Sequence, residues 1–168
     1  MILSFGNKKV FGRDSAELVL KPEGGNIFIA GKGGRKVMRL ETGEPAKINR
    51  RKLVKLARQA ISFSRANKIK TLGVNFGDFH FRHLNMSPEE TARVMAVNFE
   101  LANFEFTKYK SRPREGWNLV KEIVFAGKIT PELKKAFALG QLVGREVNAC
   151  RFLANTPGGE MTPKVLAE

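Results

Sequence analysis

The pattern of apolar and polar positions predicts two helices in the middle of the chain. Residues 47–66 carry apolar or small side chains at the spacing of one helix face, with basic side chains opposite. That inner face consists of Leu53, Leu56, Ala57, Ala60, Ile61 and Ser64. A helix over residues 88–107 opens with "SPEE", which supplies an N-cap, a first-turn proline and a capping-box glutamate. It is apolar on two faces, so we expect a cover on both sides.

A third helix is predicted from Thr130 to about Leu153. Gly140 and Gly144 lie on its apolar face. Glycine lowers helix stability, so its presence there indicates that a neighbouring backbone comes close. The one cysteine of the sequence, Cys150, falls within the apolar pattern of this helix, which predicts a buried and inert thiol.

Short apolar runs between the helices predict strands. These runs are residues 17–21, residues 26–31, part of residues 70–79, and residues 118–127. The first two flank the turn sequence "PEGG" and are predicted to pair as a hairpin. Strands that alternate with helices indicate an α/β sandwich with a mixed or parallel sheet. A length of 168 residues favours one domain.

The composition adds a strong positive charge that is concentrated in one segment. The formal net charge is +14, and residues 31–70 hold 13 Lys or Arg against Glu41 and Glu44. Such a surface attracts polyanions, nucleic acid above all, although an ordinary solvated face has the same composition. The candidate nucleic-acid-binding residues are Arg35, Lys36, Arg50, Arg51, Lys55, Arg58 and Arg65.

Candidate chemistry is otherwise sparse. A Gly-rich stretch is a candidate phosphate-binding loop, although it lacks P-loop spacing. This loop consists of Gly31, Lys32, Gly33 and Gly34. His80 and His83, with Asp78 nearby, offer at most a weak metal site, because no Cys, Asp or Glu stands close enough to complete a metal-ligand pattern. The sequence offers no catalytic triad and no dense carboxylate cluster, so we nominate no catalytic residue and no metal ligand. No apolar run reaches the roughly 18 residues of a membrane span.

The last part of the chain carries a more specific pattern. It consists of Arg151, Leu153, Asn155 and Pro157, followed by Thr162, Pro163, Leu166 and Ala167. This pattern resembles the interdomain junction of the leucyl aminopeptidases, the cytosol aminopeptidases of peptidase family M17. Upstream, "NIFIAGKG" resembles the family's strand and Gly-rich turn, and residues 49–76 resemble its next helix and strand. The resemblance is close at the C-terminal end and loose elsewhere.

The resemblance implies a fold and a division of the chain. Residues 1–155 would form an N-terminal domain with a macro-domain-like, three-layer α/β/α fold, in which helices flank a mixed sheet. Residues 156–168 would be a linker and the start of a C-terminal catalytic domain. In the family that domain removes N-terminal residues from peptides, using two divalent metal ions, Zn or Mn. No position of this sequence matches one of the metal ligands, so the chain alone is expected to be inactive.

The resemblance also implies partners. The N-terminal domain would pack on its own catalytic domain in a cytoplasmic hexamer, support assembly and limit access to the active sites. Two alternatives remain: nucleic-acid binding through residues 31–70, and binding of an ADP-ribose-type ligand at Gly31–Gly34. Residues 158–168 are too few to hold a helix alone, so without the catalytic domain we expect them to be disordered or held by a neighbouring molecule.

Overall fold

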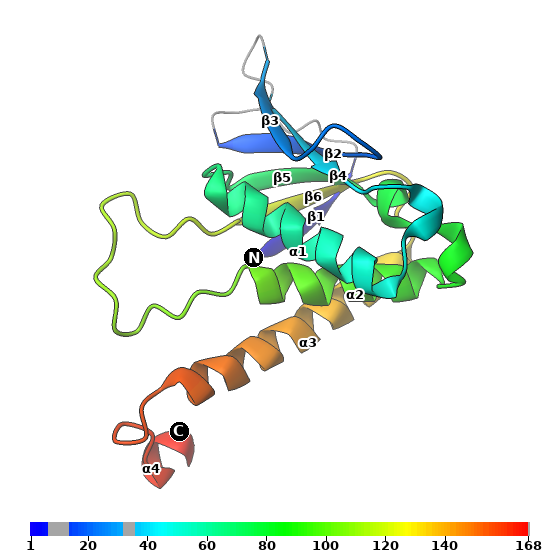
Figure 1. The fold of residues 1–168 in the computed structure, drawn as a ribbon. Helices are drawn as coiled ribbons and strands as arrows, with labels where there is room; N and C mark the ends of the chain where they lie inside the picture. The colour runs from blue at the N-terminus through cyan, green and yellow to red at the C-terminus, as the bar shows by residue number, and fades with distance from the viewer. Residues whose placement is uncertain (7–13, 32–35, 168) are drawn as a thin grey trace.

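A computed structural model describes residues 1–6, 14–31 and 36–167 and shows one mixed sheet with helices beneath it (Figure 1). The strand order is β1-β6-β5-β2-β4-β3, and only β3 and β4 pair antiparallel. The strands are β1 (Ile2–Phe5), β2 (Ser15–Lys21), β3 (Ile27–Ala30), β4 (Lys36–Glu41), β5 (Thr71–Asn75) and β6 (Glu122–Ala126). The predicted α/β class and mixed sheet are confirmed.

The second and third long helices begin where the sequence predicts, after Ser87 and Thr130, whereas the first begins at Arg50, three residues after its predicted start at residue 47. The helices are α1 (Arg50–Ala66), α2 (Pro88–Ala102), α3 (Pro131–Asn155) and the short α4 (Pro163–Ala167), with single 3-10 turns at Pro45–Lys47, Phe76–Phe79 and Arg82–Leu84. The Ser87 hydroxyl accepts a hydrogen bond from the backbone N–H of Glu90 at 3.0 Å and so caps α2. The buried face of α1 consists of the six predicted residues. Local capping and periodicity therefore determine where these helices form.

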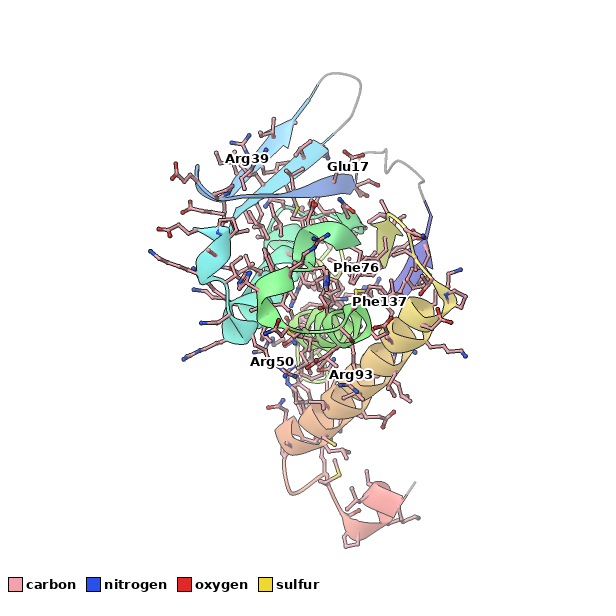
Figure 2. The ribbon with its side chains drawn as sticks, turned by 90° about the vertical axis from the view of Figure 1, so that its right-hand side faces the viewer. Glu17, Arg39, Arg50, Phe76, Arg93 and Phe137 are labelled. Atoms are coloured by element: carbon pink, nitrogen blue, oxygen red, sulfur yellow. The ribbon has the colours of Figure 1, made fainter. Side chains whose placement is uncertain are left out.

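The core lies between the sheet and the helices. In the register of the parallel strands, Phe125, Val74, Leu18 and Met38 form one row across β6, β5, β2 and β4, and all four are buried. Aromatic rings from the helices close this row from below; the ring centroids of Phe125 and Phe137 are 4.1 Å apart. Figure 2 shows Phe137 and Phe76 between the sheet and the helices.

The opposite face of the sheet is polar. Its side chains include Ser4, whose hydroxyl donates to Glu122 Oε1 at 2.6 Å, and Glu17 and Arg39, which Figure 2 shows on the side away from the helices. Alternation of apolar and polar residues along β2 and β4 produces this asymmetry, whereas on β6 only Glu122 is polar and Val124 is buried on the same face. The helices of the described residues all cover one face, so these residues form no helical layer on the other.

One predicted strand pairing is wrong. Residues 17–21 and 26–31 do contain strands β2 and β3, but β3 pairs with β4, and β4 lies between them in the sheet. Strand β4 is not predicted from the sequence, because basic residues interrupt its short apolar run. Met38 and Leu40 of β4 are fully buried, so β4 takes a central place and leaves the exposed β3 at the edge.

The end of α2 also differs from the prediction. The helix stops at Ala102 instead of continuing to residue 107. Asn103 acts as its C-cap, and its side-chain amide forms two hydrogen bonds with the backbone of Val120, donating to the carbonyl at 2.8 Å and accepting from the N–H at 2.9 Å. This exchange satisfies the backbone just before β6 and fixes the point where the chain leaves the helix.

The close packing predicted for the third helix is confirmed. A Cβ atom added to Gly140 would lie 2.5 Å from the carbonyl oxygen of Arg93, and one added to Gly144 would lie 2.6 Å from Glu100 Cβ. The two glycines therefore let α3 contact the α2 backbone. With the sheet on one side and α1 and α3 beside it, α2 has the covered faces that its sequence requires.

The prediction of a buried Cys150 is wrong, because this residue is exposed. Its helix, α3, has a second apolar side that does not face α2, and Cys150 belongs to that side. The α4 helix starts at Pro163, and none of its side chains is buried. It lies at the far end of α3 from the sheet (Figure 1). The division of the chain at residues 155 and 156 stays a prediction.

Candidate functional site

The basic residues predicted to bind nucleic acid do not act as one group. Arg50 forms an ion pair with Glu90, with Nη1 3.0 Å from Oε1. Arg58 donates from Nε to Asn98 Oδ1 at 2.8 Å and so joins α1 to α2. Lys36 begins β4, and its ammonium lies 5.9 Å from the ring centroid of Phe28. These three side chains are engaged within the domain.

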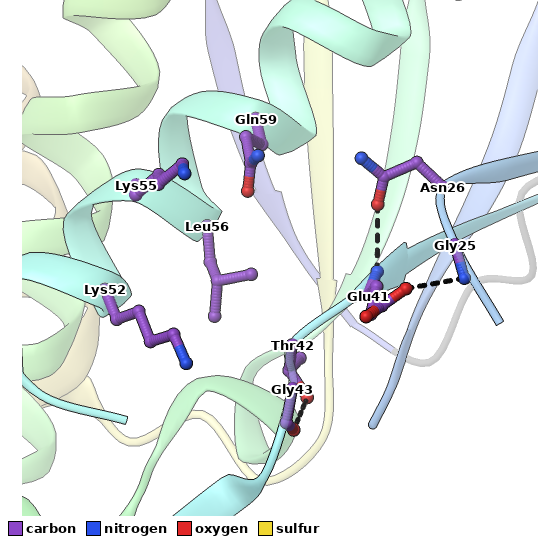
Figure 3. A pocket seen from close by; sticks show the side chains of 9 residues that line it. All are labelled: Gly25, Asn26, Glu41, Thr42, Gly43, Lys52, Lys55, Leu56 and Gln59. Atoms are coloured by element: carbon purple, nitrogen blue, oxygen red, sulfur yellow. Dashed lines mark hydrogen bonds between the residues drawn. The ribbon is translucent and has the colours of Figure 1, made fainter. Parts of the chain in front are cut away.

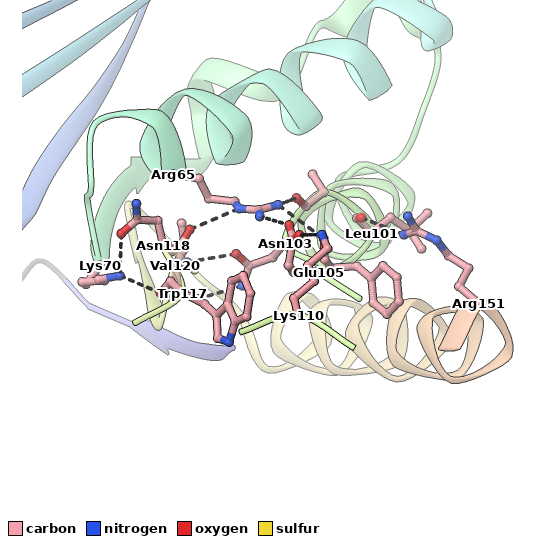
Figure 4. A network of polar contacts seen from close by, with 12 residues as sticks. Arg65, Lys70, Leu101, Asn103, Glu105, Lys110, Trp117, Asn118, Val120 and Arg151 are labelled. Carbon is pink, nitrogen blue, oxygen red and sulfur yellow. Dashed lines mark hydrogen bonds and ion pairs between the residues drawn. The ribbon is translucent and has the colours of Figure 1, made fainter. Parts of the chain in front are cut away.

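Arg65 has the most complete set of partners among these residues (Figure 4). Its guanidinium donates to the carbonyl oxygens of Ala102, Phe104 and Asn118 and pairs with Glu105 Oε2 at 2.6 Å. The carbonyls at the end of α2 carry partial negative charge, which a guanidinium stabilises. Arg65 therefore holds together α1, the end of α2 and the segment before β6.

A smaller group of basic residues remains available on α1. Arg51, Lys52 and Lys55 form no ion pair with any residue that the structure describes. Together with Lys47 and Asn49 they line a hollow of about 570 Å³. Lys47 itself pairs with Glu44 at 2.9 Å. Lys52 was not among the candidates predicted from the sequence. The helical spacing places it one turn before Leu56 of the inner face, so its position on the helix could have been predicted.

Lys52 and Lys55 also border a groove of about 400 Å³ between α1, the turn before β3 and the end of β4 (Figure 3). The groove is lined by Gly25, Asn26, Glu41, Thr42, Gly43, Lys52, Lys55, Leu56 and Gln59. Its acidic group is already bound, because Glu41 Oε2 accepts from the backbone N–H of Gly25 at 2.7 Å. Gly43 has a φ of 68° and no side chain, which leaves room for Lys52 above it. The two hollows form one positively charged surface, here called the basic groove.

The candidate phosphate-binding loop lies mostly outside the described residues. Gly31 follows β3 and is exposed, whereas Lys32, Gly33, Gly34 and the candidate Arg35 are not described. Ala30 of β3 pairs with Lys36 of β4, so the loop joins two antiparallel strands. Phosphate or ADP-ribose-type binding there stays a prediction.

Both histidines have structural contacts. His83 Nε2 lies 2.6 Å from the carbonyl oxygen of Ile48, and His80 Nδ1 lies 3.5 Å from the hydroxyl of Thr91. Across the described part of the chain, no group of three or more His, Cys, Asp or Glu side chains is placed to hold a metal ion. In the same residues, no helix is long and apolar enough to cross a membrane.

A further hollow, of about 340 Å³, lies on the polar face of the sheet where β5 ends. Asn75 and Asp78 stand at its edge, and the Asn75 amide donates to Asp78 Oδ1 at 2.9 Å. Burial raises the pKa of Asp78, and the hydrogen bond from Asn75 and the charge of Lys21 act in the opposite direction. Asn75 and Asp78 are hydrogen-bonded to each other, and we assign them no catalytic role.

Comparison with known proteins gives the class of this domain. The family model "Cytosol aminopeptidase family, N-terminal domain" matches residues 29–113. The chain belongs to this family, as the resemblance at its C-terminal end predicts. The matched residues include β4, α1, β5 and α2, where the sequence resemblance was loose, and exclude the junction pattern on which it rested.

Curated relatives agree with this membership. The chain is 24% identical over 165 residues to a probable cytosol aminopeptidase of Alkaliphilus oremlandii, covering 92% of this chain and 32% of the relative. It is 27% identical over 138 residues to the corresponding protein of Nostoc punctiforme, covering 82% of this chain and 27% of the relative. The chain thus spans about a third or less of the length of these relatives.

Solved structures share the fold. A tomato leucine aminopeptidase mutant superposes with a TM-score of 0.73 at 15% identity, covering 99% of this chain and 40% of the other. The bottromycin maturation enzyme BotP in complex with Mn gives a TM-score of 0.69 at 17% identity, covering 93% of this chain and 35% of the other. These likenesses extend over almost the whole chain, so the described arrangement of sheet and helices is that of a known class.

Proposed function

We propose that this chain is the non-catalytic N-terminal domain of a leucyl aminopeptidase, a two-metal exopeptidase that removes N-terminal residues from peptides in the cytoplasm. In this role it supports assembly of a hexamer and limits access to the active sites. The proposal rests on the match between this chain and the family model of an N-terminal domain. The chain is also only about a third as long as its curated relative.

The implied pair of divalent metal ions does not fit the residues of this chain. A two-metal centre needs several carboxylates converging on one point. The described residues contain no such group, and several of their carboxylates, among them Glu41, Glu90 and Glu105, pair with lysine, arginine or backbone N–H groups instead. We therefore assign the metals and the chemistry to the remaining part of the longer protein.

Hydrolysis of Leu-p-nitroanilide in the presence of Mn²⁺ or Zn²⁺ tests this assignment. We expect no turnover from residues 1–168 and turnover from the longer protein encoded by the same reading frame. The control is a parallel preparation of the isolated domain with Phe137→Ala, which removes a buried core ring and unfolds or strongly destabilises the domain. Activity that stays with the purified domain and disappears in this unfolded control would place catalysis in the domain itself and contradict the proposal.

A second candidate function is binding of nucleic acid through the basic groove. The specific observation in its favour is that Arg51, Lys52 and Lys55 lack ion-pair partners in the described structure while most other basic residues of α1 have them. Phosphate contacts from unpaired basic side chains release counterions, so binding would weaken steeply as salt rises.

Gel retardation of duplex DNA across a salt series tests this second function. We expect retardation at about 50 mM salt and a log–log salt slope that becomes shallower by about 1 for each of Arg51→Ala and Lys55→Ala. Arg114→Ala is the matched control, because Arg114 is an exposed cation outside the basic groove. If the wild-type domain is not retarded at low salt, or if Arg114→Ala changes the slope as much as Arg51→Ala does, the groove is ordinary solvated surface.

A further inference from the structure

The side of α3 that faces away from α2 is apolar and exposed. It consists of Leu139, Leu142, Val143, Cys150 and Leu153, here called the outer α3 face. Leu139 is 48% exposed and Leu142 is 54% exposed. The residues recur at intervals of three, four or seven, so they line one side of the helix, interrupted there by Glu146. A helix side of this kind is typical of a contact with another protein surface.

The C-terminal half of α3 is held against the end of α2, although most of its side chains are exposed. Asn148 donates to the carbonyl oxygen of Glu100 at 2.9 Å, and Arg151 donates to that of Leu101 at 3.0 Å. These bonds attach α3 to the open end of α2. The guanidinium of Arg151 also lies 4.2 Å from the ring centroid of Phe104. The outer α3 face is therefore presented by a fixed helix (Figure 1).

The segment after α2 supports the same end of α3. The ring centroids of Phe106 and Phe152 are 5.3 Å apart, and Lys108 pairs with Glu160 at 2.8 Å. Glu160 lies in the turn between α3 and α4, so this ion pair joins the loop after α2 to the chain beyond α3. Positioning the exit of the chain in this way also fixes the direction in which any following residues continue.

We propose that the outer α3 face is the docking surface for the part of the longer protein that follows residue 168, an inference that rests on the proposed function. The face extends to Leu153, near the end of α3, and Val165 and Leu166 of the α4 helix that follows are apolar and exposed as well. Relatives of this chain are about three times its length. A tethered partner needs little affinity of its own, because the short connection gives it a high effective concentration.

Charge argues against a second copy of the domain as the occupant. The domain carries a net charge of +14. A two-fold contact between two copies would bring together two surfaces of the same net charge, which repel each other. A covalently attached domain with a different sequence avoids that repulsion.

Cys150 reports directly on this docking because it is the one cysteine of the sequence and lies on the outer α3 face. Pulses of N-ethylmaleimide, with mass spectrometry of the peptide around residue 150, measure its reactivity. We expect rapid labelling in residues 1–168 and labelling slower by about tenfold or more in the longer protein. The double variant Cys150→Ser with Ser111→Cys is the control, since residue 111 is exposed in the loop after α2 and should react equally in both.

A second experiment places a charge on the outer α3 face. Leu142→Glu should leave the unfolding midpoint of residues 1–168 within about 2 °C, because Leu142 is already exposed. In the longer protein it should raise the labelling rate of Cys150 toward that of the isolated domain. Ala138→Glu, at an exposed α3 position outside the outer face, should leave the labelling slow.

The outcomes separate this inference from the proposed function. If Cys150 reacts equally fast in both proteins while the longer one hydrolyses Leu-p-nitroanilide, docking on this face is wrong and the function stands. Slow labelling in a longer protein without peptidase activity supports the docking and contradicts the function. If labelling of residues 1–168 slows as its concentration rises, a second copy covers the face and the proposed occupant is wrong.

Discussion

Arg65 shows why a basic stripe on a helix cannot be interpreted from spacing alone. It lies on the same helix as the unpaired Lys55, ten residues further on, yet it is half-buried and occupied by three carbonyl oxygens and Glu105. Its partners come from residues 102–118, about 40 positions further along the chain. Helical periodicity identified its side of α1 but not the segment that would cover it.

The pairing of Glu105 with Arg65 and Lys110 predicts a pH dependence of stability. Hydrogen bonds from Lys110 and Arg65 lower the pKa of Glu105 below its ordinary value of 4.5. The charged carboxylate is therefore favoured in the folded state. Its stabilising effect is fully present above pH 4.5 and is lost as the pH falls through the lowered pKa. Glu105→Gln should accordingly destabilise the domain at pH 7 and have a smaller effect near pH 3.

Urea unfolding at several pH values measures this change. Glu146→Gln is a suitable control, because Glu146 is exposed and forms no ion pair with any described residue. The control should change the free energy of unfolding by less than about 0.5 kcal/mol at either pH. An effect of Glu105→Gln that is equal at pH 7 and pH 3 would show that the charge of Glu105 does not contribute.

At the scale of elements, the contact between α2 and α3 depends on two glycines, Gly140 and Gly144, which have no side chain to keep the helices apart. Gly140→Ala would place a methyl group 2.5 Å from a backbone carbonyl oxygen, which cannot move without shifting α2. Overpacking of this kind costs about 1–3 kcal/mol, more than the roughly 1 kcal/mol that alanine gains over glycine in a helix. We expect Gly140→Ala to lower the free energy of unfolding in chemical denaturation.

A matched substitution shows whether the loss comes from this contact. A Cβ atom at Gly159 would have nothing within 4 Å, so Gly159→Ala should leave stability within about 0.5 kcal/mol. Stabilisation by Gly140→Ala would mean that the helices separate easily, and it would contradict the close packing described above.

The elements that the sequence predicts are those determined by neighbouring residues. Asn49, Ser87 and Thr130 cap the three long helices through hydrogen bonds only three residues away, and the inner face of α1 follows from periodicity. The elements that it misses depend on distant partners. Strand β4 is central because β2 pairs with it, and α2 ends early because Asn103 binds Val120. Neither partner is visible in the local pattern.

The part of the candidate site that depends on neighbouring residues was likewise predictable from the sequence. The concentration of charge in residues 31–70 identifies α1 as a basic element, and Arg51 and Lys55 do remain unpaired on it. The groove beside them could not be predicted, because Gly25, Glu41 and Lys52 meet only when β2, β4 and α1 are assembled. The exposure of Cys150 was missed because an apolar pattern does not say whether its cover belongs to the same chain.

At the scale of the whole molecule, the helices leave one face of a largely parallel sheet uncovered. Parallel sheets usually have helices on both faces and strands that are apolar throughout. Here the polar residues that alternate along β2 and β4, together with Ser4 of β1 and Glu122 of β6, make much of the second face compatible with water. Hydrophobic stabilisation is therefore expected to come almost entirely from the face that packs on α1, α2 and α3.

Two neighbouring positions of β4 test this asymmetry. Leu40 points toward the helices and is fully buried, so Leu40→Ala should lower the free energy of unfolding by about 2–5 kcal/mol. Val37 points to the polar face and is half-buried, so Val37→Thr should change it by less than about 1 kcal/mol. Chemical denaturation of residues 1–168 gives both values. Measured in the longer protein, a Val37→Thr cost that rises toward that of Leu40→Ala would show that the polar face is covered there, whereas an unchanged cost leaves the outer α3 face as the place of contact.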